Sequence, residues 1–294
     1  MKKNLKMSAA ILAAVMVMGS LTACGGSSSD PTTASAKDTT AAAADSGSTA
    51  AADSGSATGD VTADVQKIID AGVLKVGVKT DVPCFSLQNT ATGEYEGLED
   101  DLAYNIAGKI FGCTPDEAKE KKLVEFQGVT AKTRGPLVEN GELDMVIATF
   151  TITEERKETY NFSTPYFTDA VGLLVLKDSG INSIEDLDGK VIGVAQGSTS
   201  QKGFEAYVAE KGINVKPTFE EFDGYPALAA ALSAKNIDVF SVDRAILAGY
   251  RDDTNKLLDD RYAEQEYGVC TKKENTGLAE LVDGVVTDLK DSGK

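Results

Sequence analysis

Histidine is absent from the 294 residues of the chain, and this absence removes several kinds of chemistry. Ser-His-Asp triads, histidine general bases and histidine metal sites are all excluded. Catalysis by Asp, Glu, Lys or Tyr stays possible, but no such constellation stands out. Since the chain also has no paired cysteine motif, the sequence predicts no metal site, no cofactor and no catalytic residue.

Basic residues are scarce. There are 29 Lys and Arg against 46 Asp and Glu, which gives a formal net charge of −17. Such a surface repels nucleic acid and anionic membranes, so nucleic acid is not an expected partner. The overall charge does not determine the sign of a local cleft.

Only four cysteines occur, and the first of them, Cys24, directly follows an export signal in residues 1–23. This segment has a basic start and an apolar core, residues 7–18, that is too short to be a comfortable membrane span. It ends in Leu-Thr-Ala before Cys24, which resembles the lipobox of bacterial lipoproteins. The resemblance implies lipidation of Cys24 and an extracytoplasmic protein anchored by that lipid to the bacterial cell membrane. The alternative is a plain secretory signal cut after Ala23.

The other cysteines are Cys84, Cys113 and Cys270. Once Cys24 is lipidated their number is odd, so at most one disulfide can form. Three pairings are possible and the sequence does not choose among them. Three buried free thiols are an equal alternative.

Residues 24–60 contain Ser, Thr, Ala and Gly with scattered Asp, and they show no apolar periodicity. This composition predicts a flexible tether. From residue 61 onward, short apolar strands alternate with amphipathic helices, which indicates an α/β fold with largely parallel sheets. Glu99, Asp100 and Asp101 open one such helix and are interpreted as solvated partners of the helix dipole.

One stretch, residues 146–157, combines a strand end with a helix start. A β-branched apolar run turns polar at Thr149 and Thr151, Thr153 is a suitable N-cap, and Arg156 follows in the first turns of the helix. Helix N-termini attract anions, and a guanidinium binds a carboxylate with two parallel hydrogen bonds. The stretch therefore predicts a carboxylate site, or alternatively an ordinary strand–helix junction with a surface ion pair.

Polar groups follow four strands in all, and ligands of parallel sheets bind beyond the carboxyl ends of the strands. A cation at one strand end and an anion at another would complement a free α-amino acid, because buried charges require partners. The groups at the four strand ends are Lys79 with Asp81, then Thr149, Thr151 and Arg156, then Ser198 and Thr199, and last Asp243.

These motifs resemble the extracellular solute-binding proteins of family 3, which serve polar amino-acid ABC transporters. The resemblance is carried by residues 96–103, 148–156, 161–166, 187–198 and 243–249, of which the Thr-x-x-x-x-Arg run with Asn-Phe-Ser-x-Pro-Tyr is specific. It implies the periplasmic binding protein type II fold, with two α/β lobes joined by two hinge strands. The expected limits are residues 61–168 and 268–294 for lobe 1 and 169–267 for lobe 2. Family members usually continue past the last amphipathic helix, whereas this sequence stops at Lys294.

The resemblance also implies roles for single residues. Arg156 would bind the α-carboxylate, helped by Thr151 and by the backbone around Thr149, and Asp243 would bind the α-ammonium. Ser198 and Thr199 would add hydrogen bonds from lobe 2. Asp81 and Phe85 would line lobe 1, with Phe85 packed on the ligand.

Lys79 and Arg134 match basic positions of some family branches and would suit a second carboxylate. The expected function is therefore the substrate-binding component of an ABC importer. The protein, expected to be a monomer, would bind a free L-amino acid, with glutamate or aspartate favoured, and deliver it to the transmembrane permease. Cystine or glutamine is the alternative ligand, and Lys79 facing solvent or Arg134 in a structural ion pair would weaken the acidic choice. A dehydratase of the same fold or a sensory binding protein is the alternative function.

Overall fold

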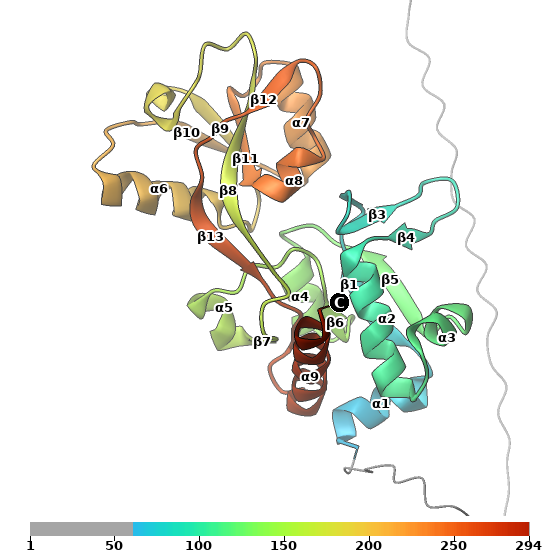
Figure 1. The fold of residues 1–294 in the computed structure, drawn as a ribbon. Coiled ribbons are helices and arrows are strands. Elements are labelled where there is room, and N and C mark those ends of the chain that lie inside the picture. Colours follow the sequence, from blue (N-terminus) through green and yellow to red (C-terminus); the bar gives the residue numbers. More distant parts are fainter. Residues whose placement is uncertain (1–60, 294) are drawn as a thin grey trace, which may run out of the picture. The chain divides into compact units, whose positions relative to one another are not determined.

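The computed structural model describes residues 61–293 (Figure 1). The expected export signal (1–23), the lipidated Cys24 and the tether (24–60) lie outside the described residues. Within 61–293, no helix has both the length and the apolar character needed to cross a membrane.

The first lobe is built on a five-stranded sheet in the order β5-β1-β6-β14-β7. The chain segment between β1 and β5 also forms a small three-stranded sheet in the order β2-β3-β4. The strands of the lobe are β1 (Leu74–Val78), β2 (Asp81–Val82), β3 (Ser86–Gln88), β4 (Tyr95–Glu96), β5 (Val124–Gly128), β6 (Met145–Val146), β7 (Tyr160–Phe162) and β14 (Cys270–Lys272). The helices are α1 (Ala63–Ala71), α2 (Leu98–Phe111), α3 (Pro115–Glu120), α4 (Arg134–Glu139), α5 (Glu154–Thr159) and α9 (Thr276–Ser292).

The second lobe is built on a six-stranded sheet in the order β10-β9-β11-β8-β12, with β13 also paired to β8. Its strands are β8 (Phe167–Leu176), β9 (Val191–Ala195), β10 (Thr218–Phe222), β11 (Val239–Asp243), β12 (Asn255–Leu257) and β13 (Tyr262–Tyr267). Its helices are α6 (Ser200–Lys211), α7 (Tyr225–Ser233), α8 (Arg244–Ala248) and the 3₁₀ turn η1 (Ile184–Leu187).

Two antiparallel strands, β8 and β13, join the lobes (Figure 1). Phe167 pairs with Tyr267, and the register shifts by one residue near Ala263, which has a φ of +48°. The expected hinge strands near 166–172 and 266–271 overlap these two, but β13 begins earlier, at Tyr262. The residue limits predicted for the lobes stay a prediction.

The sheets are mixed rather than largely parallel, which corrects the sequence interpretation. β1 runs parallel to β5 and β6, and β9 runs parallel to β10 and β11. β14 and β8 run antiparallel to their neighbours, because both sit where the chain crosses between the lobes. Periodicity along one chain segment carries no information on the direction of its partner strand.

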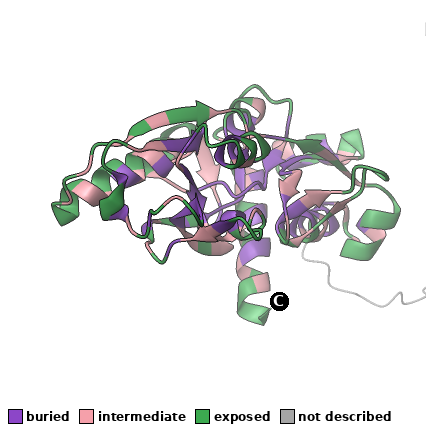
Figure 2. Cartoon of the chain, turned by 90° about the horizontal axis from the view of Figure 1, so that it is seen from above, coloured by how far each residue is buried: buried purple, intermediate pink, exposed green. Residues whose placement is uncertain are grey.

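Buried residues gather on the strands and on the helix faces packed against them (Figure 2). α2 departs from its expected pattern at its start, where Leu98 is 45% exposed. Glu99 and Asp100 are instead buried, at 0% and 1% exposure, so their interpretation as solvated charges is wrong. Asp101 is exposed as expected.

Candidate functional site

Residues near the strand ends of one lobe contact residues of the other lobe. Tyr250 Oη donates to the backbone oxygen of Asp81 at 3.1 Å, and Lys202 Nζ pairs with Glu155 at 2.7 Å. Each of these contacts joins the two lobes. The fold therefore brings the strand ends with the predicted polar groups to one region.

Arg156 contacts both lobes. Thr153 accepts a hydrogen bond from the Arg156 backbone N–H and starts α5, as predicted. The guanidinium donates to the backbone oxygen of Thr151 at 2.6 Å and to that of Gly197 in the second lobe at 3.0 Å. Burial, aided by nearby Arg134, lowers the pKa of Arg156 to about 9, so the side chain is cationic at neutral pH.

Arg134 lies at the start of α4 and is 3% exposed. It donates to the backbone oxygens of Ala148 at 2.6 Å and Thr149 at 3.0 Å, while its buried Nε has no partner among residues 61–293. Its guanidinium lies 4.1 Å from the centroid of the Phe150 ring, and that of Arg156 lies 4.6 Å from the same centroid. Phe150 is thus a site residue that the sequence analysis missed, although it stands between the two selected threonines.

Thr149 adopts a left-handed backbone, with a φ of +46°. This conformation is rare for a β-branched residue, so surrounding contacts must hold it. The Thr149 N–H donates to Glu99 Oε1 at 2.5 Å, and Tyr166 Oη donates to the same oxygen at 2.6 Å. The N–H that was expected to assist a ligand carboxylate is therefore already donated to Glu99.

Lys79 is 2% exposed, which excludes the solvent-facing alternative. Its Nζ lies 3.5 Å from Asp81 Oδ1, donates to Val129 O at 3.3 Å and sits 4.3 Å from the centroid of the Tyr225 ring. Burial lowers the pKa of Lys79, and Asp81 opposes that shift. Asp81 Oδ1 is buried and makes no hydrogen bond to the described residues.

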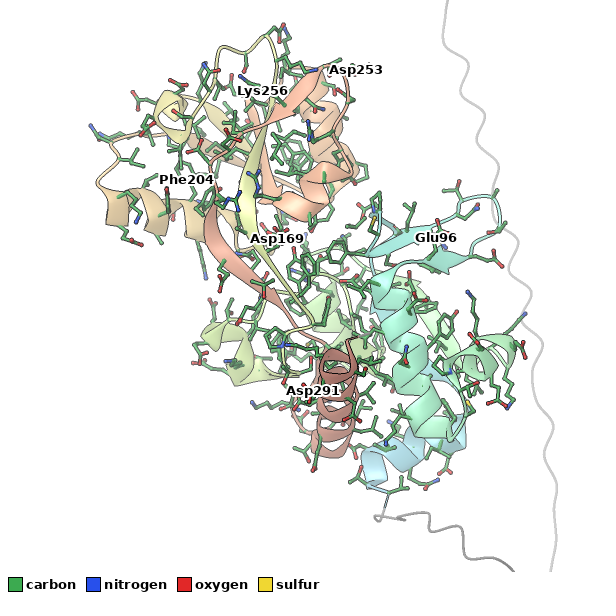
Figure 3. The ribbon with its side chains drawn as sticks, in the orientation of Figure 1. Glu96, Asp169, Phe204, Asp253, Lys256 and Asp291 are labelled. Carbon is green, nitrogen blue, oxygen red and sulfur yellow. The ribbon has the colours of Figure 1, made fainter. Side chains whose placement is uncertain are left out.

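Asp243 is the last residue of β11 and is 6% exposed. Although it is the N-cap residue of α8, its carboxylate does not cap that helix; Asp169, on the connecting strand β8, accepts from the Ala245 N–H instead, at 2.8 Å (Figure 3). Tyr267 Oη donates to Asp243 Oδ2 at 2.5 Å. Burial raises the pKa of Asp243 to about 6, and the bond from Tyr267 and the positive charges of both site arginines oppose the shift.

Phe85 belongs to an aromatic group at the connecting strands. Its ring centroid lies 5.0 Å from that of Phe167 in an edge-to-face contact and 5.9 Å from that of Tyr267. Phe85 is 5% exposed. Such contacts orient the ring and couple the first lobe to both connecting strands.

Ser198 and Thr199 line a hollow of about 930 Å³ together with Thr151, Arg156 and Gln265. Gln265 Oε1 accepts from Thr151 Oγ1 at 2.6 Å and from Thr199 Oγ1 at 2.7 Å. The sequence analysis missed Gln265, because nothing local marks a glutamine on a strand as a partner of two distant threonines.

Cys84, Cys113 and Cys270 are free thiols, so no disulfide joins them. Cys84 is exposed and Cys270 is buried, and burial raises the pKa of the Cys270 thiol. No group of three or more acidic, cysteine or histidine side chains suited to a metal occurs within residues 61–293.

Residues 74–294 match the sequence profile of the bacterial extracellular solute-binding proteins, family 3. The chain is 41% identical over 216 residues to a glutamine-binding protein of Geobacillus stearothermophilus, across 72% of this chain and 78% of that protein. It is 32% identical over 219 residues to the glutamate-binding protein GluB of Corynebacterium glutamicum, across 70% of each. Among solved structures, an ancestral arginine-binding protein bound to glutamine is 30% identical with a TM-score of 0.63, across 76% of this chain and 93% of that one.

These similarities agree with the two sheets and the paired connecting strands. The periplasmic binding protein type II fold expected from the sequence is confirmed. The relatives named above are a glutamine-binding and a glutamate-binding protein.

Proposed function

This chain belongs to the bacterial extracellular solute-binding proteins of family 3, and from that premise we propose that it captures one free L-amino acid between its lobes and delivers it to an ABC permease. We propose L-glutamine as the ligand. The lipid on Cys24 and the monomeric state belong to the same proposal; Cys24 itself lies outside the described residues.

The observation that carries the ligand class is that a cation, Arg156, and an anion, Asp243, lie in the same region of the fold. Both side chains are largely buried, and their charges are close enough to influence each other's pKa. Asp243 has a carboxylate that caps no helix, which suits an α-ammonium group. Arg156 has the planar donor geometry that suits an α-carboxylate.

The choice of glutamine rests on the pair formed by Lys79 and Asp81. Lys79 Nζ makes one long hydrogen bond, so it can donate further protons to a ligand oxygen. Asp81 Oδ1 lies 3.5 Å away, is buried and accepts no hydrogen bond from residues 61–293, so it can accept from a ligand N–H₂. A carboxamide offers one acceptor and two donors and satisfies both groups, whereas a carboxylate would face the like charge of Asp81.

Glutamate, which the sequence analysis favoured with aspartate, is the second candidate. Arg134 supports it, because its buried Nε has no partner within residues 61–293 and could donate to a carboxylate. The acidic side chains of the site oppose it. Asp81 lies against Lys79, and the charges of both site arginines already act on Asp243, so a second ligand carboxylate would add negative charge beside acidic side chains, whereas a neutral carboxamide would not.

A thermal-shift panel of the twenty amino acids plus cystine tests the proposal. A ligand at one hundred times its Kd stabilises the folded protein by about 2.7 kcal/mol. We expect the largest shift with glutamine. A shift with glutamate or aspartate alone would replace glutamine by the acidic ligand, and the absence of any shift would remove the amino-acid carrier function. Recovery of the ligand unchanged after incubation separates binding from dehydratase turnover.

A further inference from the structure

Gln265 joins the two lobes through one oxygen atom. It lies on the connecting strand β13 and is 2% exposed. Its Oε1 accepts from Thr151 Oγ1 in the first lobe and from Thr199 Oγ1 in the second. A buried side chain on a connecting strand is thus bonded to a hydroxyl from each lobe.

The orientation of the Gln265 amide follows from its other contacts. Nε2 donates to the backbone oxygens of Ala263 at 2.8 Å and Glu264 at 3.2 Å, and both of these oxygens can only accept. The amide oxygen must therefore face the two hydroxyls. The irregular backbone at Ala263 brings those carbonyls within reach of the Gln265 side chain.

The two threonine hydroxyls donate their single protons to Gln265. Each then has only lone pairs left for a ligand, so it can accept from an ammonium or amide group but cannot donate to a carboxylate. Thr199 is the N-cap residue of α6, yet its side chain does not cap that helix. Its hydroxyl is used between the lobes rather than within its own helix.

Arg156 links the same two segments by an independent route. It donates to the backbone oxygen of Thr151 and to that of Gly197, two residues before Thr199. The guanidinium and the Gln265 amide therefore both hold the loop after β6 against the loop after β9. Separation of the lobes would break the bond from Arg156 to Gly197 and one of the two bonds to Gln265 Oε1.

We propose that Gln265 is a positioning residue that latches the lobes in contact and so sets the affinity for the ligand. It acts through Thr151 and Thr199 and needs no contact with the ligand. The proposal rests on the proposed function in that the ligand is an amino acid held between the lobes.

A double-mutant cycle on the whole chain tests the latch. Kd for glutamine is measured by titration calorimetry for Gln265→Leu, Thr199→Val and the double variant. We expect each single change to raise Kd about tenfold and the double variant to lose no more than Gln265→Leu alone, because the hydrogen bond that Thr199→Val removes is already lost in Gln265→Leu. Thr199→Ser restores the hydroxyl and should recover most of the affinity lost in Thr199→Val.

Thr218→Val is the matched control, since Thr218 is an exposed threonine on β10. It should leave Kd within twofold. Additive losses in the double variant, or full affinity in Thr199→Val, would overturn the latch. If the Gln265 variant fails to fold, the radii of gyration of unliganded Thr199→Val and Thr199→Ser still decide, because a direct contact with the ligand would not change them.

Small-angle scattering separates failure of the latch from failure of the proposed function. If wild type binds no amino acid, the proposed function fails, and the latch is judged from the unliganded proteins. A larger radius of gyration in Gln265→Leu and Thr199→Val than in wild type and Thr218→Val would support it. Equal radii would overturn it.

Discussion

Charge at the level of single residues defines what this site can hold. Arg156 and Arg134 both lie against the ring of Phe150, and Asp243 is a buried carboxylate that accepts a hydrogen bond from Tyr267. Buried ions are tolerated only with partners, so each group acts on the protonation of the others. Loss of a single charge should therefore affect binding more than the loss of one hydrogen bond.

Replacement of Arg156 by alanine should weaken amino-acid binding by about 2–5 kcal/mol, because it leaves the ligand carboxylate buried without its cation. Titration calorimetry measures the change. Arg261→Ala is the control, since Arg261 is exposed. Equal affinity in Arg156→Ala and wild type would remove Arg156 from the site.

The pH dependence of binding should follow Asp243. Its pKa in the unliganded protein is about 6, and only the ionised carboxylate can pair with an α-ammonium. Affinity should therefore fall as pH drops through 6, by about tenfold at pH 5 relative to pH 7.5. Calorimetry at the two pH values tests this. Asp243→Asn should bind weakly at both, and a wild-type affinity that does not change with pH would contradict the role of Asp243.

At the level of elements, the start of α2 holds the loop that contains Phe85. Leu98 N–H donates to Cys84 O and Glu99 N–H donates to Phe85 O, both at 2.9 Å. Gly97 precedes the helix with a φ of +148°, and a Cβ built there would lie 2.2 Å from Phe85 O. The start of α2 therefore requires glycine at position 97. Glu99, in the first turn of the same helix, also accepts the hydrogen bond from the Thr149 N–H.

Gly97→Ala should destabilise the fold by at least about 1–3 kcal/mol, because the new methyl group meets backbone atoms in a conformation that only glycine tolerates. Urea unfolding measures the change. Gly284→Ala in α9 is the matched control, since its Cβ would meet nothing within 4 Å and should stabilise the helix by about 0.5–1 kcal/mol. Equal stability of the two variants would show that α2 tolerates a side chain at position 97.

For the whole molecule, the buried carboxyl groups determine how stability varies with pH. Ser86 Oγ lies 2.7 Å from Lys79 O and 2.8 Å from Asp100 Oδ1, yet it has one proton. If that proton goes to the carbonyl, the proton between Ser86 and Asp100 must come from Asp100. Burial raises the pKa of Asp100 to about 7, with Ser86 opposing the shift, and burial also raises the pKa of Glu99.

A folded-state pKa above the unfolded value means that the stabilisation is complete below about pH 4 and is lost as pH rises through 7. The free energy of unfolding should therefore fall by up to about 4 kcal/mol between pH 4 and pH 8 on account of Asp100 alone. Urea unfolding across this range measures it. Asp100→Asn should reduce the dependence, with Asp101→Asn, an exposed neighbour, as control. An unchanged slope in Asp100→Asn would show that Asp100 is ionised in the folded protein.

Features that local physics encodes could be predicted from the amino-acid sequence alone. Strand–helix alternation predicted an α/β fold, and the family resemblance implied its two lobes. Thr153 was correctly assigned as an N-cap because its partner is three residues away. The polar groups at the strand ends were found for the same reason, since the end of an apolar run marks the end of a strand. The family followed from these motifs, whereas the preference for glutamate rested on counting Lys79 and Arg134 as free cations.

Which polar groups form hydrogen bonds with one another depends on the three-dimensional fold. Thr151 and Gln265 are 114 positions apart, Thr199 and Gln265 are 66 apart, and Glu99 and Thr149 are 50 apart. The fold also buries Glu99 and Asp100 and places Asp81 next to Lys79. It pairs some neighbouring strands parallel and others antiparallel. A hydrogen bond depends on distance in space, and periodicity reports only which face of an element is apolar. The partners of each polar group, and hence its free donors and charge, are therefore fixed by the fold.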